Sequence, residues 1–390
     1  MIRNVKIGTF AIMLSVLSVM TAWGQNKHEF APINTQVPSL SIAPDARGGS
    51  MGDNGVATLP DVNSQYWNAA KYAFMGSKAG VSLSYTPWLS KLVNDVALVN
   101  MSGYYKLGDT DLQAIGASLR YFSLGDVPEG GQYEVPIYVN PYEMAFDVSY
   151  SRKLSESYSM AVALRYIRSD MGVDPNDERH AGNAFSADIS GYLEKYVIMG
   201  SAEALWSFGF NASNLGTKIS YDGGATNYFI PTKLSIGTGL LYPIDDFNRI
   251  GIYLDLSKYL VPSEPVKKEG ETDEEYQNRV DDYKSTSSIS GIFKSFGDSP
   301  NGFKGELQEV MVSLGAEYSY NEQFFVRGGY FYENANVGNR KYFSVGAGFR
   351  MSVFQLDAAY LVSTVQSNPL DQTLRFTLSF DMDGIRNLFR

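Results

Sequence analysis

Apolar and polar residues alternate along most of the chain from Val81 onward. The clearest example is residues 373–380, where Leu374, Phe376 and Leu378 fall on one face and polar residues fall on the other. A period of two is typical of a β-strand whose two faces meet different surroundings. Few of the intervening stretches resemble helices, so the pattern predicts an all-β protein.

Fourteen such segments can be distinguished, near residues 81–88, 95–106, 111–123, 143–152, 157–169, 183–194, 204–213, 232–243, 249–257, 308–319, 324–333, 341–350, 353–363 and 372–381. Most have the roughly nine to eleven residues that a tilted strand needs to cross a bilayer. Strands with an apolar residue at every second position are characteristic of outer-membrane barrels. We therefore predict a 14-stranded antiparallel transmembrane β-barrel over residues 79–390.

The connections between these segments alternate in length, as such a barrel requires. The long ones, which we expect at the outer face, are 124–142, 170–182, 214–231 and 258–307. The short ones include 108–110, 155–157, 320–323 and 351–352, and only 194–203 is longer than expected. Both chain ends of a bacterial barrel lie on the periplasmic side, where turns are short, so this parity supports the strand count.

Residues 1–24 have the organisation of a secretory signal peptide. A short basic region that ends at Lys6 precedes the apolar run Ile7 to Met20, and the small residues Ala22 and Gly24 follow. The run is shorter than the ~20 residues of a spanning helix, so cleavage is preferred over an uncleaved membrane anchor. Together with the barrel pattern, this predicts the cell outer membrane as the location.

Composition changes this picture little. The chain has no cysteine, which excludes disulfides and thiolate metal sites, and its formal net charge is −10. It has no basic cluster, so we expect no nucleic-acid partner. The mean hydropathy of −0.18 suits a barrel that exposes only every second residue to outer-membrane lipid.

Eight charged residues fall on the inward faces of the predicted strands. Near the outer end they alternate in sign and comprise Arg120, Asp147, Arg165 and Asp188; near the periplasmic end they comprise Glu317, Arg327, Arg350 and Asp357. Buried charges need partners of opposite sign. We predict that this luminal charge network holds the wall and a plug together, with selection of a substrate as the alternative.

Residues 25–78 differ from the rest because they do not alternate. Four glycines occur within residues 48–55 and allow a backbone path unlike a strand. The spacing is not that of a phosphate-binding loop, and the Lys-Ser/Thr pair of such loops is missing. We predict a plug inside the barrel, with its main contacts at Arg47, Gly48, Gly49, Met51, Gly52, Trp67 and Asn68.

These N-terminal residues resemble the FadL superfamily of outer-membrane barrels. The resemblance rests on an Ala-Arg-x-x-x-Met-Gly pattern at 46–52, on Asp61, and on residues 66–70, where the superfamily has a Trp-Asn-Pro-Ala box and this chain has Ala69 in place of the proline. The resemblance implies fourteen strands and an N-terminal segment folded into the lumen. Residues 42–53 and the closing run 374–382 are more similar still to the PorV family of the type IX secretion system.

Similarity to the PorV family implies a secretion role without catalysis. Such proteins engage the C-terminal signal domains of secreted cargo at the translocon barrel, SprA or Sov. They then deliver the cargo to a surface attachment complex that contains PorU, PorQ and PorZ. Similarity to the wider superfamily leaves a second function open, a FadL-type transporter for small hydrophobic molecules.

Catalytic and metal sites find little support in the residues. The only histidines are His28, just after the cleavage site, and His180, in an outer loop, so we expect no enzyme and no cofactor. Asp170, Asp174, Asp177 and Glu178 could attract a hard cation, but they lack the spacing of a calcium-binding loop.

The connection 258–307 is the interaction element that we predict for this chain. Its charged first part carries a capping pattern at residues 272–275, which predicts a short helix. Its last part holds Ile292, Phe293 and Phe296, which would be costly to expose unless a partner covered them. We predict that these three residues bind a protein partner, with a solvated loop as the alternative.

Overall fold

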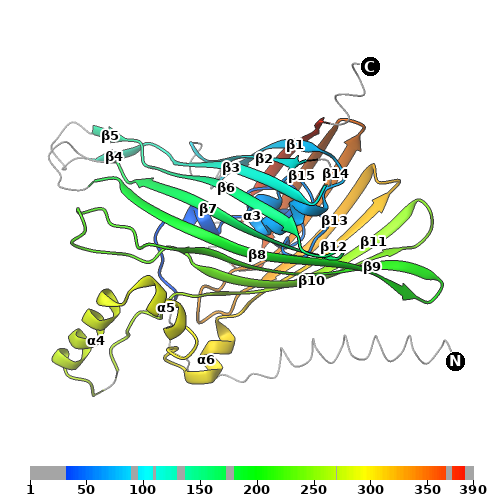
Figure 1. Cartoon of the computed structure of the whole chain (residues 1–390). Helices are drawn as coiled ribbons and strands as arrows, with labels where there is room; N and C mark the ends of the chain where they lie inside the picture. Colours follow the sequence, from blue (N-terminus) through cyan, green and yellow to red (C-terminus); the bar gives the residue numbers. More distant parts are fainter. Residues whose placement is uncertain are drawn as a thin grey trace. The chain divides into compact units, whose positions relative to one another are not determined.

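The alternating segments form the fourteen strands of one closed antiparallel β-barrel, which confirms the predicted fold class (Figure 1). The computed structural model describes residues 32–88, 95–108, 111–129, 137–172, 180–268, 270–365 and 371–382. The predicted signal peptide, residues 1–24, lies outside these ranges. So do His28 and the acidic residues Asp174, Asp177 and Glu178.

The barrel strands match the predicted segments closely. They are β1 Ala79–Pro87, β2 Val96–Leu107, β3 Gln113–Leu124, β6 Tyr142–Lys153, β7 Tyr158–Asp170, β8 Gly182–Met199, β9 Ala202–Gly216, β10 Lys233–Pro243, β11 Asn248–Tyr259, β12 Met311–Tyr320, β13 Phe324–Tyr332, β14 Lys341–Met351, β15 Phe354–Ser363 and β16 Leu374–Asp381. Each pairs with its neighbours in sequence, and β1 closes the barrel against β16, with Gly80 opposite Asp381.

Three differences from the prediction stand out. The segment 194–203 is not a loop, because β8 and β9 continue through it as a hairpin that turns at Gly200. The connection after β3 contains a two-stranded ribbon, β4 Val127–Glu129 with β5 Ile137–Val139. The strand predicted from residue 308 begins at Met311, because a helix occupies the preceding residues.

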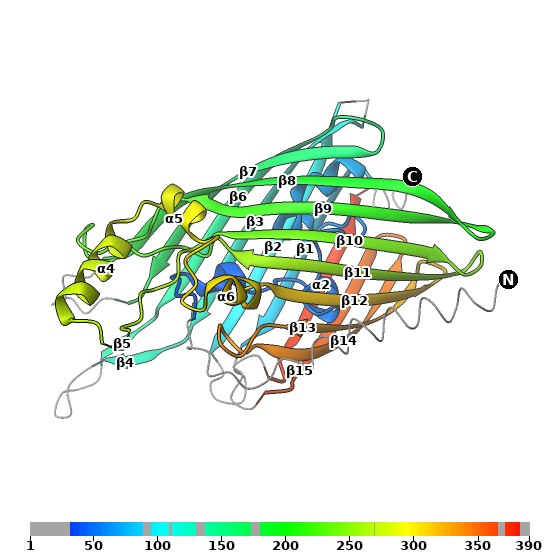
Figure 2. The ribbon, with the colours of Figure 1, turned by 90° about the horizontal axis from the view of Figure 1, so that it is seen from below.

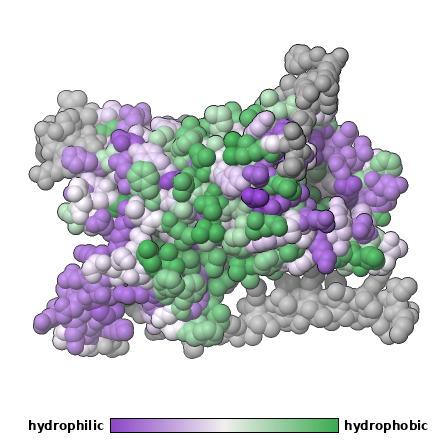
Figure 3. Space-filling view, in the orientation of Figure 1, coloured by the Kyte–Doolittle hydropathy of each residue, from purple (hydrophilic) through white to green (hydrophobic). Residues whose placement is uncertain are grey.

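The two faces of the wall carry different side chains. On β7, Val162 and Leu164 are exposed, whereas the intervening Ala161, Ala163 and Arg165 are buried in the lumen. The same alternation on the other strands produces an apolar band across the visible wall (Figure 3). This is the distribution of a wall with lipid outside and a packed lumen inside.

The lumen holds the N-terminal segment. It consists of η1 Pro38–Ser41, α2 Ala46–Ser50, α3 Ser64–Trp67 and η2 Ala69–Phe74, and most of its side chains are buried. At Gly52 the backbone has φ +72°, and a Cβ there would lie 2.7 Å from the Tyr330 backbone of β13. The plug can approach the wall this closely only because that residue has no side chain.

The long connection between β11 and β12 forms three helices, α4 Asp273–Ser285, α5 Ser288–Lys294 and α6 Gly302–Gln308. They lie outside the wall near the ends of β9 and β10 (Figures 1 and 2). The predicted cap is confirmed: Thr272 and Glu275 form a reciprocal capping box at the start of α4. In the part of the chain that the structure describes, no helix has the length and apolar character needed to span a membrane.

Candidate functional site

A chain of buried charges joins the plug to the wall at Arg47. Its guanidinium donates to both carboxylate oxygens of Glu317, at 3.1 and 3.0 Å, and to Asp61 at 2.9 Å. Arg327 continues the chain by donating to Glu317 at 2.6 Å and to Asp357 at 2.7 Å. Because each charge meets an opposite one, the desolvation cost of burying it is offset.

Arg350 extends this chain only indirectly. It donates to the side chain of Gln355 at 2.8 Å, and Gln355 donates to Asp357 at 2.7 Å. Arg350 itself is exposed at the short-turn end of the lumen. The structure therefore brings together three of the four residues predicted at this end, and adds Arg47 and Asp61 from the plug.

Arg165 forms the centre of the second charged cluster. It donates to Asp147 at 2.6 and 3.0 Å, and to Asp188 at 3.1 and 2.9 Å. Asn214 also accepts from Arg165. Arg120, predicted in the same network, points instead to the plug, where it donates to the carbonyls of Ser39 and Ile42. A reason is visible at Asp147, whose two oxygens already accept from Arg165 and from the Ser118 hydroxyl.

Trp67 and Asp45 fix the internal shape of the plug. Asp45 caps α2 by accepting from the Gly48 amide at 2.8 Å, and it also accepts from the Trp67 indole at 2.6 Å. The indole lies against Gly48, where a Cβ would be 2.5 Å from the ring. Burial, with a contribution from the nearby charge of Asp61, raises the pKa of Asp45 to about 6.

Asn68 connects the plug to β8 and caps η2. Its amide donates to the carbonyls of Val56 and Gly191, and its oxygen accepts from the Ala70 amide. Elsewhere, Met51 and Gly52 lie against the wall at Gly329, and Gly49 lies against Arg375. All seven residues predicted for the plug are thus buried within it or between it and the wall.

Further anchors were not recognised in the sequence. Asp53 accepts from Arg375 at 2.6 Å and from the Tyr342 hydroxyl at 2.7 Å. Asp255 accepts from the amides of Gly55 and Val56 at 2.8 and 2.9 Å. Asp255 and Arg375 are charged residues at inward positions of alternating strands, so the signal that identified Asp147 could have identified them.

Lys71 is a fully buried cation of the plug. Its ammonium donates to the Gly55 carbonyl at 2.8 Å and to the Thr58 hydroxyl at 3.1 Å. Burial lowers the pKa of Lys71 to about 8, although Asp61 acts in the opposite direction. Burial alone would raise the pKa of Asp61, but the charges of Lys71 and Arg47 hold it below its usual value. Within the plug, Lys71 and Arg47 thus favour the charged form of Asp61.

Cavities remain on both sides of the plug. The cavity at the long-loop end, which we call the mouth cavity, has a volume of about 560 Å³ and is lined by Ile42, Trp88, Phe122, Leu124 and Arg340, with Asp53 and Arg375 also in its lining. A cavity of about 370 Å³ at the short-turn end is lined partly by Arg47, Met75 and Phe354. Arg47 and Asp53, six residues apart in the plug, thus face different cavities.

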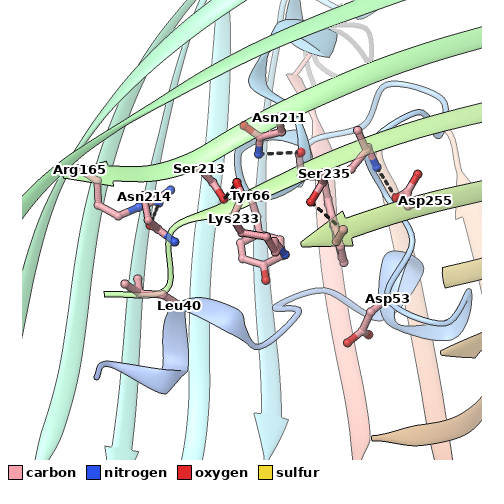
Figure 4. A pocket seen from close by; sticks show the side chains of 13 residues that line it. Leu40, Asp53, Tyr66, Arg165, Asn211, Ser213, Asn214, Lys233, Ser235 and Asp255 are labelled. Atoms are coloured by element: carbon pink, nitrogen blue, oxygen red, sulfur yellow. Dashed lines mark hydrogen bonds between the residues drawn. The ribbon is translucent and has the colours of Figure 1, made fainter. Parts of the chain in front are cut away.

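A third cavity of only about 30 Å³ lies between the plug and β9–β11 (Figure 4). Its lining is polar and includes Asn211, Asn214, Lys233 and Asp255, with Tyr66 from the plug. This is space for one or two water molecules and not for an organic ligand.

The helices outside the wall present an apolar area, here named the α5–α6 surface. It consists of Ile289, Phe293, Phe296, Phe303 and Leu307, which are 49–79% exposed. The predicted Phe293 and Phe296 belong to it, whereas Ile292 is half-buried. Phe303 and Leu307 of α6 were not predicted, although they lie in the same connection, 258–307, as Phe293 and Phe296. α4, by contrast, has no buried residue and is highly charged.

Of the residues considered for chemistry, the structure describes Asp170 and His180, and both make only local contacts. Asp170 pairs with Arg168 at 3.5 Å, and the backbone amide of His180 donates to the Tyr221 carbonyl. Among the described residues, no three or more histidine, cysteine or acidic side chains gather in a way that could hold a metal ion.

Comparisons with known proteins identify a family and a fold. The family described as type IX secretion system protein PorV matches residues 25–266. The fold resembles the Pseudomonas putida toluene transporter TodX, at 9% identity over 90% of this chain and 99% of that one, with a TM-score of 0.50. A Pseudomonas aeruginosa FadL homologue is 11% identical over 91% of this chain and 100% of that one, with a TM-score of 0.45. Comparison with curated proteins gives no match.

Proposed function

Because this chain belongs to the PorV family of type IX secretion system proteins and forms an outer-membrane barrel, we propose that it binds secreted cargo and delivers it to the cell surface. The cargo would be recognised through its C-terminal signal domain at the translocon barrel, SprA or Sov. Delivery would be to the attachment complex of PorU, PorQ and PorZ. The observation that supports this most is an apolar surface outside a barrel whose lumen is blocked by the plug.

The filled lumen argues for a docking role over a conduit for protein. The plug is tied to the wall at separate points by Arg47, Asp53 and Asn68. Displacing the plug would require breaking these contacts together, and two of them are buried ion pairs. A folded or extended cargo chain has no comparable space inside the barrel, so contacts would form at its rim and outer loops.

The α5–α6 surface supplies the contact area for such a partner. Phe293 is 74% exposed and Phe303 is 79% exposed, on helices at the long-loop end, which faces outward in outer-membrane barrels. Aromatic side chains commonly provide most of the binding energy of an interface. We assign this surface, and not the polar α4, to the cargo or to the translocon.

A transporter for small hydrophobic molecules is the second candidate. The observation in its favour is the mouth cavity, whose wall includes Trp88, Phe122 and Leu124. Where this cavity meets the plug, however, its lining includes the ion pair of Asp53 with Arg375. Uptake of small apolar solutes by cells that carry the barrel, compared with cells that lack it, separates this function from secretion.

The α5–α6 surface can be tested by Phe293→Ser with Phe296→Ser. We expect reduced recovery of the translocon and attachment proteins and less cargo at the surface, with normal amounts of folded barrel in the membrane. A matched control is Leu154→Ser with Phe247→Ser, which removes two apolar residues of similar exposure at the other end of the barrel. Normal partner recovery and cargo display in the first variant would refute the assignment.

A further inference from the structure

The β8–β9 hairpin extends beyond the neighbouring β6–β7 hairpin at the short-turn end (Figure 2). β8 has 18 residues, well above the roughly nine to eleven that cross a bilayer. Its pairing with β7 ends at Leu193, opposite Tyr158. Residues 194–199 therefore pair with β9 alone, and no other strand in the described part of the chain lies along their second edge.

The backbone groups on this open edge can be identified from the ladder. The Glu194 amide makes the last bond on the β7 side, to the Ser157 carbonyl at 2.9 Å. In an antiparallel ladder, every second residue directs its N–H and C=O to the same side. Tyr196 and Ile198 thus direct theirs to the open edge, where no residue that the structure describes makes a backbone hydrogen bond to them.

The side chains on this edge cannot be explained by contact with lipid. Tyr196 and Ile198 are 64% and 83% exposed. They have the same parity as Asp188 and Tyr192, which point into the lumen, so they lie on the lumen-side face of the hairpin and not on the lipid-facing one. Exposed apolar groups on this face need another partner.

The usual protections of a free edge are also missing here. Natural sheets guard exposed edges with charges, prolines or bulges, because unpaired backbone groups recruit another strand. Residues 196–199 are Tyr-Val-Ile-Met, with no charge and no proline. Lys195 is on the opposite face by parity, whereas Glu194 precedes the edge on the same face and Glu203 of β9 lies opposite Ile198. The edge is therefore complementary to an extended segment that carries no negative charge.

We infer that residues 195–199 of β8 form a strand-addition site for an extended polypeptide segment with apolar side chains at alternate positions. Main-chain hydrogen bonds to Tyr196 and Ile198 provide the affinity, and the exposed side chains provide the preference for apolar partners. Short turns mark the periplasmic end of outer-membrane barrels, so the segment belongs to a polypeptide in the periplasm. This site lies at the opposite end from the α5–α6 surface and is independent of the proposed function.

The test uses the full mature barrel in detergent and a defined probe, the peptide acetyl-Lys-Thr-Val-Thr-Val-Thr-Lys-amide. Amide hydrogen exchange at Tyr196 and Ile198 should be fast in the free barrel and at least tenfold slower with saturating peptide. The amides of Val197 and Met199, which face β9, should be protected in both states. The same peptide with alternate amides N-methylated should give no protection, because it cannot complete the ladder.

A variant provides the second measurement. Ile198→Pro removes the N–H on the open edge without removing one that bonds to β9, and should weaken peptide binding at least tenfold. Ile198→Ala keeps the N–H and should weaken it less. Equal binding of the N-methylated peptide would overturn the inference. Protection of Tyr196 and Ile198 that rises with barrel concentration alone would also overturn it, because a second copy would then occupy the edge.

Discussion

At the residue scale, the buried charges of this barrel differ in how much stability their removal should cost. Arg165 is the single cation between Asp147 and Asp188, and it bonds to both carboxylates. Arg120, buried in the same wall, contacts backbone carbonyls and the Tyr66 ring. The first residue compensates two buried charges, whereas the second compensates none directly.

We therefore expect Arg165→Met to destabilise the barrel by about 3–5 kcal/mol, because it leaves two neighbouring carboxylates without a cation. Asp147→Asn should cost less, since the amide oxygen still accepts from Arg165 and the pair with Asp188 survives. Urea unfolding of the purified barrel, followed by the loss of β-structure, measures both. Equal stability of Arg165→Met and the wild type would show that the cluster contributes nothing to the wall.

The sequence predicts which of these residues face the lumen, but it does not predict which partners they bind. Alternation alone predicts that Asp147, Arg165 and Glu317 face inward, and in the structure all three are buried. Partners depend on rotamers and on which acceptors are already occupied, which alternation does not describe. That is why Arg120 was grouped with Asp147 although Ser118 and Arg165 occupy that carboxylate.

At the element scale, the sequence predicts the strands of the barrel wall but not the extension of β8 and β9 beyond it. A period of two identifies a strand wherever its faces differ, and this condition fails at residues 194–199, where both faces meet water. The same limit applies to α5 and α6, which are single short helices of seven residues each. The plug was recognised by its lack of alternation and by the family resemblance, but its turns depend on individual contacts with the wall.

Gly52 is the plug position where such a contact can be tested. We expect Gly52→Ala to loosen the plug, because the added Cβ meets the Tyr330 backbone and the residue has a positive φ. Gly76→Ala is the matched control, since a Cβ there meets nothing within 4 Å. Hydrogen exchange of plug amides should accelerate in the first variant only. Identical exchange in both variants would contradict the close packing of the plug against β13.

At the scale of the whole molecule, this protein is a closed barrel whose wall is joined to the N-terminal plug by buried ion pairs. Family membership and fold could be predicted because they depend on motifs and periodicity spread over the whole chain. Of the α5–α6 surface only Phe293 and Phe296 could be predicted, since the exposure of Phe303 and Leu307 depends on how the loop folds over the wall. The mouth cavity and the cavity at the other end are separated by plug residues, with Arg47 beside one and Asp53 beside the other.

This arrangement predicts a barrel that does not conduct ions. In planar bilayers, we expect the wild-type protein to give no steady conductance, because its plug is anchored to Glu317 through Arg47 and to Arg375 through Asp53. The double variant Arg47→Met with Asp53→Asn breaks both anchors and should give frequent opening steps. Arg350→Met is the control, because it removes a luminal charge that bonds to Gln355 and not to the plug.

Steady conductance of the wild type would show that the plug leaves an open path, and the transporter would then be the better explanation. A silent double variant would mean instead that packing alone, through residues such as Trp67 and Met51, retains the plug.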